Sequence, residues 1–163
     1  MSFYDNKYKL FSEWEWISYG KGNKVSIEEF IETHPDAQFY IGTDSQNYSK
    51  KGNRYCTFTT VLVAYTMGKG GCAILASEKT EKMDNLRQRL MIEAMRSLEV
   101  GWFLDKKIDQ NRIVTIHLDV NDSIKFKSGK YKDELVGFVT AQGFECQHKP
   151  NAWAASWAAD KFC

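Results

Sequence analysis

The chain has 163 residues, of which 43% are hydrophobic, and a formal net charge of +1. A chain of this length forms one domain that buries about 70% of the surface exposed by its unfolded form. The nearly neutral charge excludes a protein that is basic throughout, so any basic surface for nucleic acid must be local. The four cysteines contain no CxxC pair and only three histidines are present, which gives a zinc finger little support.

The sequence lacks the features of an exported or membrane-spanning chain. Residues 1–11, MSFYDNKYKLF, are charged and aromatic and contain no apolar core of a signal peptide. No apolar run approaches the ~18 residues that a transmembrane helix requires. We therefore expect a cytoplasmic protein with no membrane contact, and no oligomeric state is predicted.

Residues 1–163 are predicted to form a single domain with an N-terminal extension. The extension, residues 1–36, is expected to contain one short helix, and residues 37–162 are expected to form the core. The helix is predicted within 25–31, because Ser26 is a suitable N-cap and a glutamate three residues later completes a capping box. The following His-Pro pair ends it.

Three antiparallel strands are expected to open the core. The segments Ala37–Asp44, Tyr55–Thr66 and Cys72–Ser77 are rich in β-branched and aromatic residues. A polar loop is predicted at Asn47–Arg54, and the glycines of Gly68–Gly71 predict a turn.

Helices and strands then alternate along the rest of the chain. Apolar periodicity predicts the helices Asp84–Leu104 and Tyr131–Gln142, and a final helix is expected at Ala152–Phe162. Strands are predicted at Ile113–Val120 and Phe144–His148. The order β-β-β-α-β-α-β-α predicts an α/β fold with a mixed five-stranded sheet and helices on both faces.

Two acidic residues stand where predicted strands end. Asp44 follows the first strand within Gly-Thr-Asp-Ser-Gln, where the alternative is an Asx-turn that starts the loop. Asp119 shares one side of its strand with Thr115 and His117, while the other side is apolar. The alternative for Asp119 is an ion pair with a lysine of the next loop. Carboxylates at the ends of two strands indicate a site for a hard metal ion.

Glu93 is the acid of the long helix that lies at the edge of its apolar stripe, close in angle to Leu90. The alternative is a surface ion pair with Arg89 or Arg96, worth only a few tenths of a kcal/mol. Glu78 is kept as a weaker substitute for this position.

Asp160 completes the candidate set on the last predicted helix, where it shares a face with Trp153 and Trp157. An acid late in a helix is slightly disfavoured by the helix dipole, so its position requires a reason. Carboxylates from different elements can hold two hard cations roughly 4 Å apart, the arrangement that stabilises both oxygens of a phosphodiester displacement. Oxygen ligands suit Mg²⁺ or Mn²⁺ better than zinc.

Three stretches carry a resemblance to a known family: Ile41–Gln46, His117–Asp119 and Lys149–Asp160. They resemble the YkuK-type family of predicted ribonuclease H-related proteins, and the resemblance extends from Val25 to Phe162. It implies the ribonuclease H-like fold.

The resemblance also implies a role for each acid. Asp44 would bridge both metals and Asp119 would bind the metal on the nucleophile side. Glu93 would hold the other metal and orient the attacking water, and Asp160 would be the ligand of the last helix. Auxiliary positions are Ser45, Gln46, His117 and His148, although a structural role is the simpler interpretation of both histidines.

Basic residues gather in two segments that follow Asp44 and Asp119. We predict contacts with phosphate from these lysines and arginine, and stacking of bases on Phe126 or Tyr131. The alternative is a pair of solvated loops. The residues are Lys50, Lys51, Arg54, Lys125, Lys127 and Lys130.

The sequence therefore predicts a nuclease that depends on two Mg²⁺ or Mn²⁺ ions and acts on RNA, an RNA–DNA hybrid or structured DNA. The alternative is a catalytically silent module of the same fold that binds nucleic acid or protein. A phosphohydrolase of small molecules would require a deep pocket.

Overall fold

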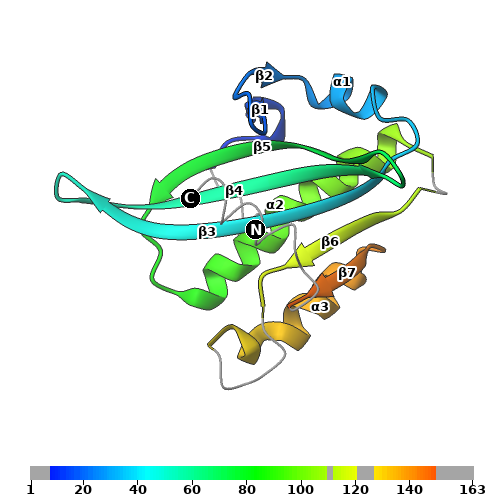
Figure 1. Ribbon diagram of the computed structural model, residues 1–163. Helices are drawn as coiled ribbons and strands as arrows, with labels where there is room; N and C mark the ends of the chain where they lie inside the picture. The colour runs from blue at the N-terminus through cyan, green and yellow to red at the C-terminus, as the bar shows by residue number, and fades with distance from the viewer. Residues whose placement is uncertain (1–7, 110–111, 121–126, 150–163) are drawn as a thin grey trace.

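A mixed sheet of seven strands, in the order β2-β1-β5-β4-β3-β6-β7, forms the centre of the computed structural model (Figure 1), which describes residues 8–109, 112–120 and 127–149. The strands are β1 (Trp16–Ser18), β2 (Lys24–Val25), β3 (Gln38–Lys50), β4 (Asn53–Thr66), β5 (Gly70–Glu81), β6 (Val114–Leu118) and β7 (Glu145–His148). The helical elements are η1 (Phe11–Glu13), α1 (Ile27–Glu32), α2 (Leu86–Lys107), η2 (Lys127–Tyr131) and α3 (Lys132–Thr140).

The predicted mixed α/β architecture is confirmed, but the predicted number of five strands is wrong. The two additional strands, β1 and β2, come from the N-terminal extension, and β1 pairs antiparallel with β5 through Ile17 and Leu75. Strands of three and two residues are too short to show the alternation of apolar and polar residues that identifies a strand in a sequence. They extend the sheet on the side away from β6 and β7.

The predicted polar loop at Asn47–Arg54 is instead the end of a long hairpin. β3 and β4 remain paired out to Lys50 and Asn53, and only Lys51 and Gly52 connect them. Both connecting residues have positive φ, 52° and 79°, as in a two-residue type I′ turn. The hairpin projects past the end of β5 at the left of Figure 1.

The three described α-helices share one apolar core with the sheet. Phe30 of α1, Leu98 of α2 and Leu135 of α3 belong to the same buried cluster as Ile41 of β3. The predicted final helix, Ala152–Phe162, lies outside the described residues, so helices on both faces stay a prediction. No helix in the described part of the chain combines the length and apolar composition needed to cross a membrane.

A line of buried polar contacts joins α2 to the sheet. Arg96 is 1% exposed, and its guanidinium lies 3.0 Å from Glu78 Oε1 and donates from Nε to Thr60 Oγ1 at 2.9 Å. Thr43 Oγ1 lies 2.8 Å from Ser97 Oγ. These contacts are directional, so they fix the rotation of α2 about its axis in a way that apolar packing alone does not.

The pair Arg96–Glu78 makes a testable contribution to stability. The variant Arg96→Met leaves Glu78 buried without its partner, so we expect the free energy of unfolding to fall by about 3–5 kcal/mol, measured by urea denaturation. Adding Glu78→Gln to this variant removes the uncompensated charge and should recover most of the loss. Equal stability of the single and double variants would contradict this assignment.

Two helical glycines provide a second test because their surroundings differ. A Cβ at Gly101 of α2 would lie 2.9 Å from the buried ring of Phe144, whereas a Cβ at Gly137 of α3 meets nothing within 4 Å. We expect Gly137→Ala to stabilise the protein by about 0.5–1 kcal/mol through helix propensity. Gly101→Ala should destabilise it by about 1–3 kcal/mol through overpacking. Urea denaturation of both variants measures the difference. Stabilisation by both variants would contradict the prediction and show that the Phe144 ring moves to accommodate the added methyl group.

Candidate metal centre

Asp44 and Asp119 are brought together by the parallel pairing of β3 with β6. The ladder ends with Gly42 beside His117, and the same register carried two residues further sets Asp44 opposite Asp119. Figure 1 shows β6 diverging from β3 toward its carboxyl end, with α2 visible behind the gap. The two acids therefore stand just beyond the end of the parallel ladder, beside the carboxyl end of β6, while β3 itself continues to Lys50. Ligands commonly bind at the carboxyl ends of strands in α/β sheets.

Glu93 completes a cluster of three carboxylates. Oxygen atoms of Asp44, Glu93 and Asp119 all lie within 4.8 Å of one another. Glu93 reaches the cluster from α2, and Ser45 Oγ donates a hydrogen bond of 2.5 Å to its Oε2. Asp44 and Glu93 are 8% and 6% exposed, so most of their charge is removed from water.

Burial and the charge of neighbouring carboxylates raise the pKa values of Asp44 and Glu93. Burial raises the pKa of Asp44 to about 7, assisted by its hydrogen bond with Asp119 and the charge of that neighbour. Burial and then the charge of Asp44 raise the pKa of Glu93 well above its usual range, although the Ser45 hydrogen bond opposes this. Crowded carboxylates with too little compensating charge fit a divalent cation, and a donor set made only of oxygen fits Mg²⁺ or Mn²⁺.

Lys149 supplies one positive charge at the cluster. Its Nζ forms an ion pair with Asp119 Oδ1 at 2.6 Å. The expected alternative partner for Asp119 was a lysine of the next loop, but Lys149 instead follows β7. Leu118 of β6 pairs with His148 of β7, and the same parallel register continued by one residue sets Asp119 beside Lys149. Lys149 belongs to a stretch noted in the sequence, but only this register reveals its role.

Two other acids are candidates for the site, and of these only Glu78 lies within the described residues. Glu78 pairs with Arg96 at 3.0 Å and is not part of the carboxylate cluster, so it does not replace Glu93. Arg96 is therefore the partner of Glu78 and not of Glu93. Asp160 lies outside the described residues, so its place in the site stays a prediction.

The auxiliary residues occupy different environments. His117 is 2% exposed, its ring lies 5.3 Å from that of Tyr40, and burial lowers its pKa to about 4. A buried histidine that is neutral at pH 7 fits the structural interpretation of His117 better than the auxiliary one. His148 ends β7, and its Nδ1 lies 3.0 Å from the carbonyl oxygen of Lys149. Gln46 is exposed on β3, two residues beyond Asp44.

The predicted basic residues form two groups. The first occupies the tip of the β3–β4 hairpin and comprises Lys50, Lys51 and Arg54; the second lies in η2 and comprises Lys127 and Lys130. All five are exposed. Lys125 lies outside the described residues, and contact with nucleic acid stays a prediction for both groups.

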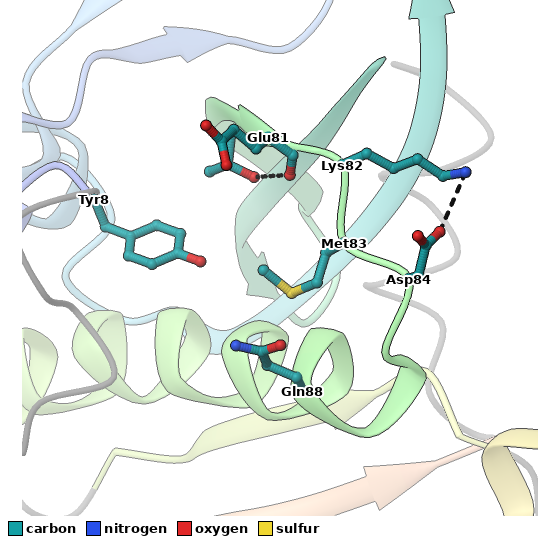
Figure 2. Close-up of a pocket in the computed structure, with 7 residues that line it drawn as sticks. Tyr8, Glu81, Lys82, Met83, Asp84 and Gln88 are labelled. Carbon is teal, nitrogen blue, oxygen red and sulfur yellow. Dashed lines mark hydrogen bonds and ion pairs between the residues drawn. The ribbon is translucent and has the colours of Figure 1, made fainter.

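A separate cavity of about 450 Å³ lies between the end of β5 and the start of α2 (Figure 2). Its lining residues are Tyr8, Thr80, Glu81, Lys82, Met83, Asp84 and Gln88. Lys82 and Asp84 pair with each other at 3.1 Å, and none of the three clustered carboxylates lines the cavity. The cavity is therefore distinct from the candidate metal centre.

Residues 24–163 match the family Ribonuclease H-like. Since this match covers most of the sequence, the chain belongs to the ribonuclease H-like family. Its relatives include the Uncharacterized protein YkuK of Bacillus subtilis (strain 168), which is 26% identical over 156 residues covering 83% of this chain and 86% of that protein. The predicted membership of a YkuK-type ribonuclease H-like family is thereby confirmed.

The crowding of the carboxylates predicts that metal ions and protons compete for Asp44. Without metal, folded Asp44 keeps its proton up to about pH 7, while the unfolded side chain loses it near pH 4. The folded state then binds more protons, so stability falls as pH rises across this window. Millimolar Mg²⁺ or Mn²⁺ should raise the melting temperature by roughly 5–10 °C at 100 times Kd, with a larger rise at pH 8 than at pH 5.

Thermal unfolding with and without metal at both pH values measures this effect. The variant Asp44→Asn should lose most of the metal response, while Asp105→Asn, an exposed acid of α2, should keep it. A melting temperature that is unchanged by metal at pH 8 would contradict a preformed site.

Proposed function

We propose that this protein is a divalent-metal-dependent nuclease that hydrolyses phosphodiester bonds in RNA, an RNA–DNA hybrid or structured DNA. One observation carries the proposal: in a chain of the ribonuclease H-like family, Asp44, Glu93 and Asp119 converge within 4.8 Å from three separate elements. Buried carboxylates held this close together cost free energy unless a cation compensates them.

In this proposal Asp44, Glu93 and Asp119 hold two Mg²⁺ or Mn²⁺ ions, with Asp160 as a further ligand. When bound, the ions supply positive charge that activates water and stabilises the leaving 3′-oxygen. Asp44 must give up its proton for this purpose, and its pKa of about 7 allows it to do so near neutral pH.

Two neighbours orient these ligands. The Ser45 hydroxyl donates to Glu93 Oε2 and holds that carboxylate against β3. Lys149 holds Asp119 from the opposite side and reduces the negative charge before metal binds. Such orientation of ligands by a second layer of contacts typically changes metal affinity or activity 10–100-fold.

The contact of Lys149 also favours the alternative of a catalytically silent module. Its ammonium group already lies 2.6 Å from Asp119 Oδ1 and supplies part of the charge that a metal would supply. In that case the protein would bind nucleic acid or a protein without cleaving it. The lysine side chain is 38% exposed, so in the proposed nuclease it would turn toward solvent when an ion binds.

A cleavage assay separates the two functions. Labelled RNA, DNA, hybrid and junction substrates are incubated with the protein in Mn²⁺. We expect Asp44→Asn, Asp119→Asn and Glu93→Gln each to lower the rate about 10²–10³-fold, because each removes a charge that stabilises the transition state through the ions.

The variant Asp105→Asn is the matched control, because it changes an exposed acid on the helix that carries Glu93. Its rate should equal that of the unmodified protein. Binding without cleavage of every substrate would favour the silent module, and cleavage that persists in Asp44→Asn and Asp119→Asn would contradict the proposed site.

A further inference from the structure

A row of exposed side chains leads away from Asp44 along the same face of the sheet. Because successive residues of a strand point to opposite faces, Asp44 shares its face with Gln46, Tyr48 and Lys50 of β3. In register, Tyr48 is paired with Tyr55 of β4. Gln46, Tyr48 and Lys50 are exposed, in contrast to buried Asp44.

The neighbouring strand β5 contributes Lys79 to the same face, since Lys79 pairs with Thr57 and Thr57 pairs with Gln46. We call the set Gln46, Tyr48, Lys50, Tyr55 and Lys79 the distal strip. We propose that the distal strip binds a single-stranded nucleic-acid segment that continues from the bond to be cleaved. This inference rests on the proposed function and specifies its substrate.

The aromatic residues of the strip form a platform suited to bases. The rings of Tyr48 and Tyr55 lie 5.5 Å apart, and Lys79 Nζ lies 4.4 Å from the centre of the Tyr55 ring. Tyr55 is on the middle strand, so Tyr48 and Lys79 flank it and restrict its motion. Tyr48 keeps 39% of its surface exposed. Stacking of a base on an exposed, supported ring is the usual way in which proteins hold single strands.

Charge on the hairpin complements phosphate. The sequence from Ser45 to Ser77 contains no Asp or Glu, while Lys50, Lys51 and Arg54 surround the tip. The nearest acid on the strip's face in register is Glu81, opposite Tyr55 at the end of β5. The hairpin beyond the carboxylate cluster is thus cationic although the whole chain carries a charge of only +1.

The spacing also fits a strand of nucleic acid. Tyr48 follows Asp44 by four residue steps, a distance of about 13 Å along a strand. An unstacked single strand is more extended than one strand of a duplex, which rises 3.4 Å per nucleotide, so it covers this distance in fewer than about four nucleotides. A base on Tyr48 would therefore belong to a nucleotide a few positions from the scissile bond, and phosphates beyond it would reach Lys50.

A single strand suits these residues better than a duplex or an acidic protein. Bases in a duplex are stacked on each other, so their faces are closed to Tyr48, whereas unpaired bases are open to it. An acidic peptide would use the lysines but would gain little from the paired tyrosine rings. The aromatic residues therefore decide between these partners.

Fluorescence anisotropy of labelled oligouridine and oligothymidine, with the full chain in EDTA to prevent cleavage, tests the strip. We expect Tyr48→Ala to weaken binding about tenfold, as loss of one stacked base does, and Tyr48→Phe to bind normally. Tyr65→Ala is the matched control, because Tyr65 is also 39% exposed and lies on β4 at the opposite end of the sheet. Its affinity should remain within about twofold of the unmodified protein's.

Lysine variants provide a second readout. Lys79→Ala should reduce the slope of log K against log salt by about 0.7, the value for one phosphate contact on a single strand. Lys69→Ala, an exposed lysine in the β4–β5 turn, should leave this slope unchanged.

The inference is overturned if Tyr48→Ala and Tyr65→Ala bind alike, if blunt duplex binds more tightly than single strands, or if polyglutamate competes with oligouridine at equal charge. If the protein cleaves nucleic acid and Tyr48→Ala binds it normally, the role of the distal strip is refuted and the proposed nuclease function is retained. If Tyr48→Ala weakens binding but the protein cleaves no substrate, the role of the distal strip is retained and the proposed nuclease function is refuted.

Discussion

The hydrogen bonds between α2 and β3 determine where the carboxylates can meet. Thr43 contacts Ser97 and Ser45 contacts Glu93. A step of two residues forward along β3 therefore corresponds to a step of four residues backward along α2. Four helical residues rise about 6 Å and two strand residues about 6.6 Å, so both contacts form at once. A rotation of α2 that moved Glu93 away from Asp44 would break both contacts and leave buried hydroxyl groups without these hydrogen-bond partners.

The same arrangement places an electrostatic cost inside the fold. Asp44 and Glu93 are buried beside Asp119, and apolar Leu90 and Leu118 line the crevice next to them. The core formed by α2 and the sheet must offset this cost in the absence of metal, with help from Lys149. A cation that binds here relieves repulsion that the carboxylates already experience without it. This relief adds to the free energy of binding, as is usual for a strong site for a hard metal ion.

The sequence allowed Asp44 and Asp119 to be paired because each follows an apolar run of a predicted strand, although Asp44 lies in the middle of β3, which continues to Lys50. Glu93 could be chosen by its angle to the apolar stripe. Lys149 could not be assigned, since its contact depends on a register between strands distant in sequence. β1 and β2 escaped prediction because they are too short for periodicity. The residues of Asn47–Arg54 are polar on both faces, which made a projecting hairpin resemble a loop.

The shared register of β3, β6 and β7 restricts how such a chain can diverge. One residue inserted into β6 would turn every later side chain of that strand to the opposite face, and Asp119 would leave both Asp44 and Lys149. Substitutions along these strands preserve the register between them, whereas single insertions destroy it. The β3–β4 tip is under no such restriction, because paired additions on its two arms preserve alternation. Length variation within the family should therefore accumulate at that tip rather than in the parallel strands.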